Sequence, residues 1–146
     1  MEYDSPQKGV WGMRLSRTVA YALQATLYLA RSESEKPIPC SRLAAEGRMP
    51  ERFLLQILRN LVAHGILNST RGVEGGYSLQ RAPGDISLLE VIEAIDGPMI
   101  SKLPVGEGLP GDARERLQQA VTGVTDLARR ELSAIKLAHL LPKPDV

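Results

Sequence analysis

Four side chains that can hydrogen-bond to base edges recur at helical spacing near the middle of the sequence. Arg48, Arg52, Gln56 and Arg59 fall on one arc of a helical wheel drawn at about 100° per residue. An arginine can bond O6 and N7 of guanine, and a glutamine can bond N6 and N7 of adenine. Leu55 shares the arc, where it would meet a thymine methyl group or simply remain exposed. The pattern indicates a helix face that contacts a nucleic acid, and the alternative is a solvated charged face.

A glycine-rich segment, RGVEGGY, follows at residues 71–77. Such glycines suit a phosphate-binding loop, a tight turn or a loop laid against a nucleic acid. The segment lacks the Lys-Ser/Thr pair of a Walker-type nucleotide loop. Arg71 is long enough to reach a phosphate or a narrow minor groove, and Gly72, Gly75 and Gly76 would let the backbone lie close to DNA. Glu74 would repel phosphate unless it points away or pairs with an arginine.

Helical periodicity predicts the elements that position these residues. Residues 16–31 are expected to form a helix capped by Ser16, and residues 40–47 a short helix with Ser41 as its cap and Gly47 at its end. A third helix spans residues 50–64. Pro50 and Glu51 open that helix, Gly65 follows its end, and its N-terminus can face a phosphate. Its apolar arc is expected to face the core and consists of Phe53, Leu54, Ile57, Leu58 and Leu61.

Two short β-capable stretches, residues 66–71 and 77–81, predict a hairpin whose tip is the glycine-rich segment. Tyr77 is expected to pack this hairpin on the domain body. A further helix over residues 87–98 carries the capping-box pattern Ser87-x-x-Glu90 and ends at Gly97-Pro98. This order of elements is that of a winged helix-turn-helix, in which the second helix of the motif enters the major groove and the hairpin is the wing.

Residues 99–111 are predicted to form a loop, and a long helix begins at Asp112. An apolar stripe runs along that helix and must pack either on its own domain or on a second copy of the chain. Because so short a chain has little core to cover it, we expect dimerisation. The stripe consists of Leu117, Val121, Val124, Leu127, Ala128, Leu132 and Ile135. The expected fold is therefore mainly α with a small β-hairpin: a winged helix-turn-helix domain (residues 13–98) plus a long C-terminal dimerisation helix (residues 112–146).

Charge and composition narrow the classes of function. Residues 13–81 hold ten Lys and Arg against five Asp and Glu, whereas residues 82–146 are net acidic, which favours a polyanionic partner for the first part only. One cysteine, Cys40, excludes an intrachain disulfide and fits a reducing cytoplasm. With two histidines besides, no metal site or cofactor is expected. No catalytic constellation or membrane span is recognisable, and residues 1–12 are expected to be a flexible extension without a signal peptide.

Three stretches resemble a known family: MRLSRTVAYAL (13–23), LLQILRNLVAHGILNSTRGVEGGYSLQRAP (54–83) and ISLLEVIEAIDGP (86–98). They are similar to the Rrf-two type of winged helix-turn-helix transcriptional regulators, which includes IscR-like and NsrR-like members. IKLAHLL (135–141) resembles the short segment that closes the family's long helix. The resemblance implies a homodimeric repressor on a roughly palindromic operator in double-stranded DNA. It assigns base recognition to the 50–64 helix and a groove contact to Arg71.

One departure from the family pattern concerns the signal. Sensing members carry three cysteines in the loop before the dimerisation helix, whereas residues 99–112 contain none, so no iron–sulfur cluster is expected. Leu55 stands where some relatives have an acidic residue, which changes the expected operator. The effector, a small molecule or a protein, is not identified. Two other functions stay open: a redox-thiol switch at Cys40, whose pKa a helix N-terminus could lower, and a winged-helix protein-interaction module that does not bind DNA.

Overall fold

A computed structural model describes residues 12–32, 36–103 and 108–143. The helices are α1 (Arg17–Arg31), α2 (Cys40–Gly47), α3 (Glu51–Ala63), α4 (Leu88–Asp96), α5 (Gly111–Ala134) and α6 (Leu137–Leu140), with a 3-10 turn η1 (Pro83–Asp85). Strands β1 (Leu67–Thr70) and β2 (Gly76–Leu79) pair antiparallel. The expected mainly helical fold with one hairpin is confirmed. None of the helices in this described part combines the length and apolar character that a bilayer crossing demands.

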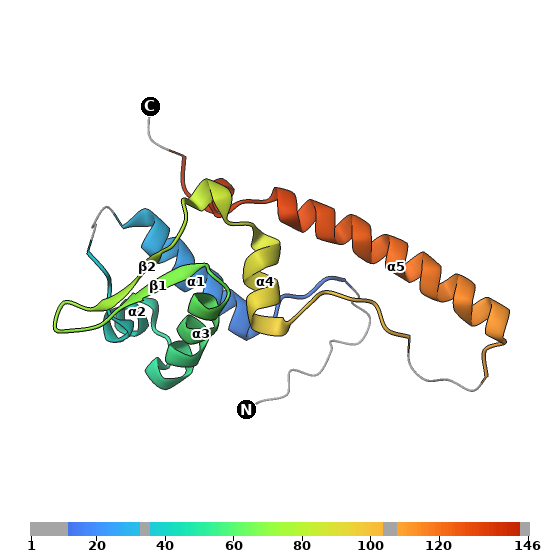
Figure 1. Ribbon diagram of the computed structural model, residues 1–146, viewed down its shortest axis with the longest axis horizontal. Coiled ribbons are helices and arrows are strands. Elements are labelled where there is room, and N and C mark those ends of the chain that lie inside the picture. Colours follow the sequence, from blue (N-terminus) through green and yellow to red (C-terminus); the bar gives the residue numbers. More distant parts are fainter. Residues whose placement is uncertain (1–11, 33–35, 104–107, 144–146) are drawn as a thin grey trace.

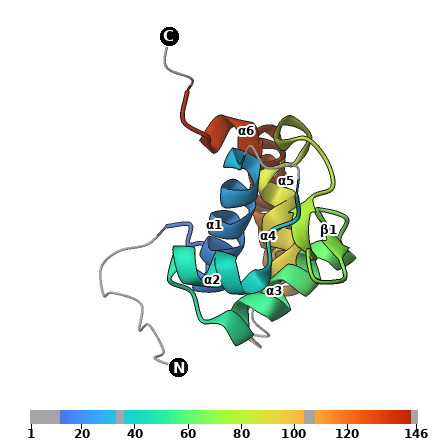
Figure 2. The same ribbon diagram turned by 90° about the vertical axis from the view of Figure 1, so that its left-hand side faces the viewer.

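Helices α1 to α4 pack into a body from which the hairpin and α5 extend in opposite directions (Figure 1). The view turned by 90° shows α1 and α4 side by side, with α2 and α3 across one end (Figure 2). The core of this body includes Leu43, Leu54, Leu58, Leu61 and Ile66, all essentially buried. Three of these come from α3. Their packing in the core fixes the orientation of α3 and therefore the direction in which its opposite side faces.

Two helices, α1 and α4, begin with the side-chain caps that the sequence predicted. Ser16 Oγ accepts a hydrogen bond from the Val19 amide at 3.1 Å, as expected for an N-cap. Ser87 and Glu90 form both bonds of the predicted capping box. The carboxyl end of α4 has Gly97 at φ 84°, a conformation that glycine adopts without strain. These predictions are confirmed.

Helix α2 spans the predicted residues 40–47, but its capping residues differ from the prediction. The helix begins at Cys40 with Pro39 as its N-cap, so Ser41 lies inside the first turn and caps nothing. Ile38 pairs with Tyr77 in an isolated β-bridge, which keeps the chain extended up to Pro39 and makes Pro39 the N-cap. At the other end the left-handed position falls on Arg48 (φ 53°) instead of Gly47.

Helix α5 has two distinct faces where the sequence predicted one stripe. The inner face lies against its own protomer: Leu132 is 7% exposed and packs with α1 and α4, and Ile135 packs against the same cluster. Gln118 Nε2 donates to the Ser101 carbonyl at 3.0 Å, so the segment after α4 also covers this face. The outer face leaves three large apolar side chains in solvent: Leu117, Val124 and Leu127. Leu132 and Ile135 therefore contribute to packing within the protomer.

Gly76 has no room for a side chain, because it lies against the backbone of Ile38 and Pro39. A Cβ at this position would lie 2.5 Å from the Ile38 carbonyl oxygen and 2.6 Å from the Pro39 nitrogen. We expect Gly76→Ala to lower the free energy of unfolding by about 2–4 kcal/mol, because the hairpin must separate from Ile38. Chemical denaturation measures this loss. Gly84→Ala is the matched control, since nothing lies within 4 Å of its Cβ, and it should change stability by less than about 0.5 kcal/mol. Equal losses in the two variants would contradict this explanation.

Candidate nucleic-acid interface

The solvent side of α3 carries the polar side chains that the wheel predicted. Arg52, Gln56 and Arg59 are exposed, and Leu55 is half-buried at the edge of the same surface. Gln56 Nε2 donates to Asn60 Oδ1 at 3.2 Å, which orients its amide one turn further along the helix. A row of two guanidinium groups and one amide on a rigid helix has the donors that base edges in a major groove accept.

The turn between α2 and α3 places three further candidates at the amino end of α3. Arg48, Pro50 and Glu51 are all exposed there, with Pro50 as the N-cap. Gln24 Nε2 on α1 donates to the Gly47 carbonyl at 2.8 Å, and the Met49 amide donates to the Ala44 carbonyl at 2.9 Å. Both bonds hold this turn on the body. Arg48 thus lies before the first residue of α3 and extends the basic surface past the amino end of this helix.

Phe53 corrects the predicted core face of α3. The sequence assigned it to the buried arc, but its side chain is 44% exposed and stacks edge-on against Tyr21 of α1, with ring centroids 6.1 Å apart. On a wheel of about 100° per residue, Phe53 sits at the margin of the arc, next to Arg52. Its place beside the predicted base-reading residues makes it a contact candidate that the sequence reasoning missed. The signal was its position at the edge of the apolar arc, about 140° from Leu58 on the wheel.

The wing glycines have structural roles within the protein. A Cβ on Gly75 would lie 2.9 Å from the Gly72 carbonyl oxygen, and Gly76 lies against Ile38. Gly72 has φ 112° and no atom within 4 Å of its Cβ position, so it serves the turn and leaves its outer side open. Two of the three glycines thus allow close packing inside the protein. Tyr77 packs partly buried against the core, which confirms its predicted role.

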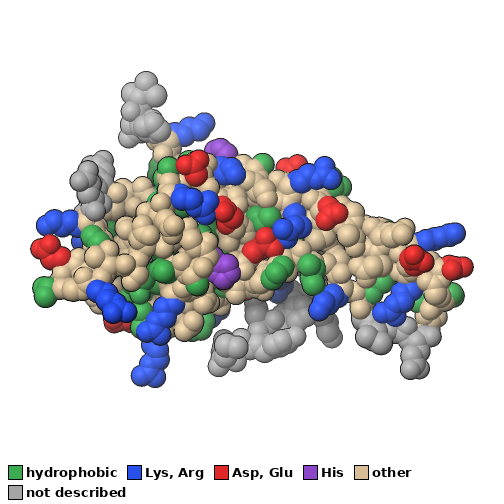
Figure 3. All heavy atoms as spheres, viewed as in Figure 1, with side chains coloured by type: hydrophobic (Ala, Val, Ile, Leu, Met, Phe, Trp, Pro, Cys, Tyr) green, Lys and Arg blue, Asp and Glu red, His purple; other side chains and the backbone are tan. Residues whose placement is uncertain are grey.

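The wing tip is fully accessible. Arg71, Val73 and Glu74 are exposed, and within the described residues no ion pair joins Glu74 to Arg71. Figure 3 shows basic side chains projecting from the end of the molecule formed by the hairpin, α2 and α3, with acidic side chains interspersed. Arg71 is therefore free to make an outside contact, and Glu74 stands beside it without neutralising it.

Cys40 does not have the environment of an activated thiol. Its Sγ donates to the Glu51 carbonyl oxygen at 3.7 Å, and the side chain packs against the core. Burial raises the pKa of the Cys40 thiol, and the Glu51 carboxylate adds to this effect. The expectation that the helix N-terminus lowers this pKa is wrong, because desolvation and a nearby negative charge both disfavour the thiolate.

A helix-turn-helix with an exposed polar recognition helix and an adjoining β-wing defines the winged helix-turn-helix class of transcriptional regulators. Residues 15–143 match the family Rrf2, described as an iron-dependent transcriptional regulator, and the chain belongs to this family.

Relatives of known name support the family assignment. The HTH-type transcriptional regulator Rv1287 of Mycobacterium tuberculosis is 40% identical over 96 residues, or 66% of this chain and 60% of that protein. The match thus spans less than two thirds of that relative. IscR of Xenorhabdus nematophila is 30% identical over 135 residues, covering 92% of this chain and 82% of IscR. The solved structure of CymR, the global cysteine regulator of B. subtilis, superposes with a TM-score of 0.70 at 27% identity, covering 92% of this chain and all of that one.

The iron dependence in the family description raises the question of a metal or cluster site. The chain has one thiol, Cys40, and two histidines. Cys40 lies on α2 against the core, away from the segment that precedes α5. Across residues 12–32, 36–103 and 108–143, no group of three or more His, Cys, Asp or Glu side chains could hold a metal ion. The donor set does not fit a thiolate-bound iron–sulfur cluster, which usually needs several cysteine ligands.

Proposed function

We propose that this chain is a homodimeric DNA-binding repressor that reads a roughly palindromic operator. Residues 13–98 form the DNA-binding unit, with α3 in the major groove and the 71–77 wing in the minor groove. Residues 112–146 form the dimerisation unit, joined to it by the 99–111 loop. A dimer bound across a promoter would exclude polymerase, which is why repression is the proposed activity.

The observation that carries this proposal is the exposed polar side of α3 next to an accessible Arg71. The inner side of α3 is fixed by Leu54, Leu58 and Leu61, so its outer side is a rigid surface. A fixed helix backbone presents the side-chain donors at a set spacing, so the helix itself does not have to be ordered on binding. The predicted contacts to DNA are Arg48, Pro50, Glu51, Arg52, Leu55, Gln56, Arg59, Arg71, Gly72, Gly75 and Gly76.

Dimerisation is proposed through the outer face of α5. Val124 is 67% exposed and Leu127 58% exposed, one turn apart on the same side as Leu117. Apolar side chains at this spacing pack well against a second helix. Within the predicted stripe, these three are the residues that the protomer itself leaves uncovered, and Val121 and Ala128 flank them half-buried. A twofold pair of such helices would hold two recognition helices on successive half-sites.

The alternatives from the sequence have less support. A thiol switch at Cys40 needs a reactive thiolate, whereas the pKa of this thiol is raised. A protein-interaction module without DNA binding would not require guanidinium groups on both α3 and the wing. Its complex with a protein would also show a weaker response to salt than binding to DNA.

Salt dependence tests the DNA assignment directly. The protein should bind a fragment of its own promoter, and its affinity should fall by about a thousandfold or more between about 50 and 200 mM salt, because bound arginines release condensed counterions. Fluorescence anisotropy with a labelled duplex measures this slope. A scrambled duplex should bind more weakly at each salt concentration. Binding that is insensitive to salt, or equal for both duplexes, would contradict the proposal.

A further inference from the structure

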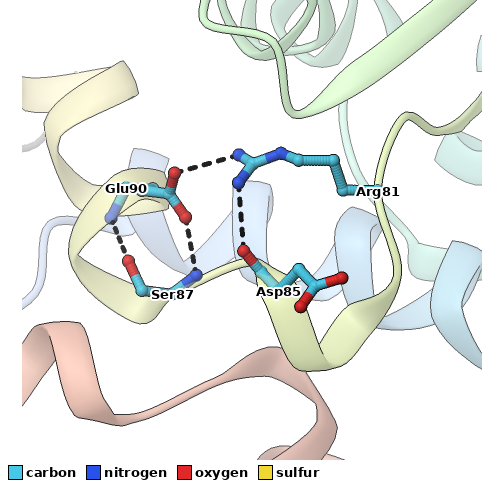
Figure 4. A network of polar contacts seen from close by, with 4 residues as sticks. All are labelled: Arg81, Asp85, Ser87 and Glu90. Atoms are coloured by element: carbon cyan, nitrogen blue, oxygen red, sulfur yellow. Dashed lines mark hydrogen bonds and ion pairs between the residues drawn. The ribbon is translucent and has the colours of Figure 1, made fainter.

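Arg81 links the end of the wing to the start of α4. It lies two residues after β2, and its guanidinium makes two bonds to the next segment (Figure 4). Nη1 donates to the Asp85 carbonyl oxygen at 3.0 Å, and Nη2 donates to Glu90 Oε1 at 3.0 Å. The base of the wing is thus attached at two points to the chain that leads into α4.

Glu90 serves two purposes with one carboxylate. While Oε1 accepts from Arg81, Oε2 accepts from the Ser87 amide at 2.8 Å and closes the capping box of α4. Burial raises the pKa of Glu90, but the Ser87 amide and the Arg81 guanidinium outweigh it and leave the pKa below its usual value. The carboxylate therefore stays ionised near neutral pH, and the wing and the helix cap share one anchor.

The anchor itself is held by the end of α5. The Leu88 amide donates to the Ile135 carbonyl at 2.8 Å, and the Leu137 amide donates to the Ile86 carbonyl at 2.9 Å. Ser87 and Lys136 form a β-bridge between these bonds, and both Ile86 and Leu137 are fully buried. Glu90 consequently belongs to a rigid part of the protein. Its bond to Arg81 holds the end of β2 in a fixed position relative to that part.

The direction of the wing depends on how its two strands are attached. Strand β1 continues from α3 through Gly65 and Ile66, so its base moves with the recognition helix. Strand β2 is held by its pairing with β1, by the two backbone bonds between Tyr77 and Ile38, and by Arg81. Since no hydrogen bond or ion pair among the described residues joins the exposed tip to the body, these attachments set where Arg71 points.

We propose that Arg81 and Glu90 are positioning residues for DNA recognition: their ion pair fixes the base of the wing at the angle that brings Arg71 into the minor groove. This inference rests on the proposed function, since it needs the wing to contact DNA. The pair is only partly exposed, with 35% of the Arg81 and 41% of the Glu90 side chain accessible, and its two-point geometry restrains direction as well as distance.

Glu90→Gln separates positioning from simple electrostatics. The amide oxygen of glutamine can still accept from the Ser87 amide, so the cap and the fold should survive. Removing a negative charge near DNA would by itself strengthen binding. Loss of wing positioning instead predicts about tenfold weaker operator binding in fluorescence anisotropy, less than the loss for Arg71→Ala, because both wings of the dimer are misplaced but keep their arginines. The proposal would be overturned if Glu90→Gln bound the operator as tightly as the wild type, or more tightly, while Arg71→Ala bound it more weakly.

A double-mutant cycle then shows whether the effect passes through Arg71. If Glu90 and Arg81 act by aiming the wing, Glu90→Gln or Arg81→Gln should add less than about twofold to the loss caused by Arg71→Ala. An additive loss would mean that Arg81 contacts phosphate directly or that α4 is damaged, and it would overturn the proposal. Arg81→Lys should restore part of the affinity, because one ammonium can reach Glu90 but cannot bond Asp85 as well.

Glu93→Gln is the matched control. Glu93 is also an ion-paired carboxylate on α4, with Oε2 2.7 Å from Arg129 Nη1, but it faces α5 and touches no part of the wing. It should change operator affinity by less than about twofold with dimer in excess. A loss equal to that of Glu90→Gln would assign the effect to α4 in general and overturn the proposal. If the single variant Arg71→Ala bound the operator as tightly as the wild type, the proposed wing contact would be wrong. This result distinguishes failure of the proposed function from failure of the Arg81–Glu90 proposal.

Discussion

Arg71→Ala is expected to weaken operator binding by about a hundredfold or more, since a homodimer loses two groove contacts worth about 1–3 kcal/mol each. Arg71 is exposed at the start of the wing, and no ion pair within the described residues has to be broken before it binds DNA. The variant should fold as the wild type because its side chain is not part of the core. Anisotropy titration at a fixed salt concentration measures the loss.

Arg59→Ala should cause a loss of similar size for a different reason. Arg59 is exposed on α3 and is proposed to bond a base edge, so its removal should also reduce discrimination between the operator and a variant duplex. If Arg71 contacts the backbone or the narrow minor groove, its loss should weaken both duplexes more evenly. The ratio of the affinity for the operator to the affinity for the variant duplex should therefore fall in Arg59→Ala and change little in Arg71→Ala. This difference would assign the two arginines to separate grooves.

Arg116→Ala provides the control for charge. It removes the same guanidinium group from the exposed surface of α5, near the amino end of this helix, and Figure 1 shows that this end of α5 is remote from the wing. Its effect on affinity should stay within about twofold, because exposed charges beyond a Debye length of about 8–10 Å are screened. A comparable loss in all three variants would indicate general electrostatic attraction and would contradict the assignment of Arg59 and Arg71 to specific contacts.

The sequence predicted the elements well because each depends on local chemistry. The apolar positions of α3 repeat at helical spacing, and the Ser87–Glu90 box and Gly97 mark both ends of α4 without reference to the rest of the protein. The hairpin followed from two β-capable stretches around a glycine-rich tip. Local patterns such as these carry their structural meaning within a few residues, so no tertiary contact was needed to interpret them.

The predictions that failed depend on contacts between distant residues. The N-cap of α2 is Pro39 and not Ser41, because the pairing of Ile38 with Tyr77 keeps the chain extended up to Pro39, which no local pattern around Ser41 reveals. The raised pKa of Cys40 results from burial of its side chain against the core, an effect that opposes the lowering expected from a helix N-terminus. Gly75 also has a packing role within the wing that the sequence did not show, because the sequence does not reveal which backbone atoms surround it; its proposed contact with DNA is unaffected.

The same limit applies to the stripe on α5. Heptad-like spacing predicts one apolar surface, but Leu132 faces α4 and Val124 faces solvent. The division follows from the segment after α4, whose Ser101 carbonyl and hydroxyl bond to Gln118 and to the Val121 carbonyl. Because that segment covers one side of the helix, the surface left for a partner is narrower than the sequence indicated. It is centred on Val124 and Leu127.

Leu127→Glu should convert the proposed homodimer into a monomer. Leu127 is 58% exposed in the protomer, so the substitution should leave the fold intact, while in a symmetric helix pair two carboxylates would be buried close together. Each would cost several kcal/mol without a partner charge, so the dimer should dissociate at micromolar concentration. Sedimentation velocity measures the mass, and circular dichroism should show unchanged helix content.

Loss of the dimer should also remove most of the operator affinity. Two half-sites bound by linked recognition domains gain about 10²–10⁴ in affinity over a single domain, because the second contact becomes intramolecular. Leu127→Glu should therefore bind a full operator no better than a half-site, although every proposed DNA-contacting residue is intact. That combination differs from Arg71→Ala, which should remain dimeric and still prefer the full operator.

Gln119→Glu tests whether added charge alone causes dissociation. Gln119 is exposed on α5 and, at about 100° per residue, lies away from both Leu127 and the inner face that contains Leu132. The variant adds the same negative charge to the same helix but should stay dimeric and bind the operator within about twofold of wild type. If Leu127→Glu also stays dimeric, the outer face of α5 is not the interface. The contact would then have to involve surfaces other than Leu117, Val124 and Leu127.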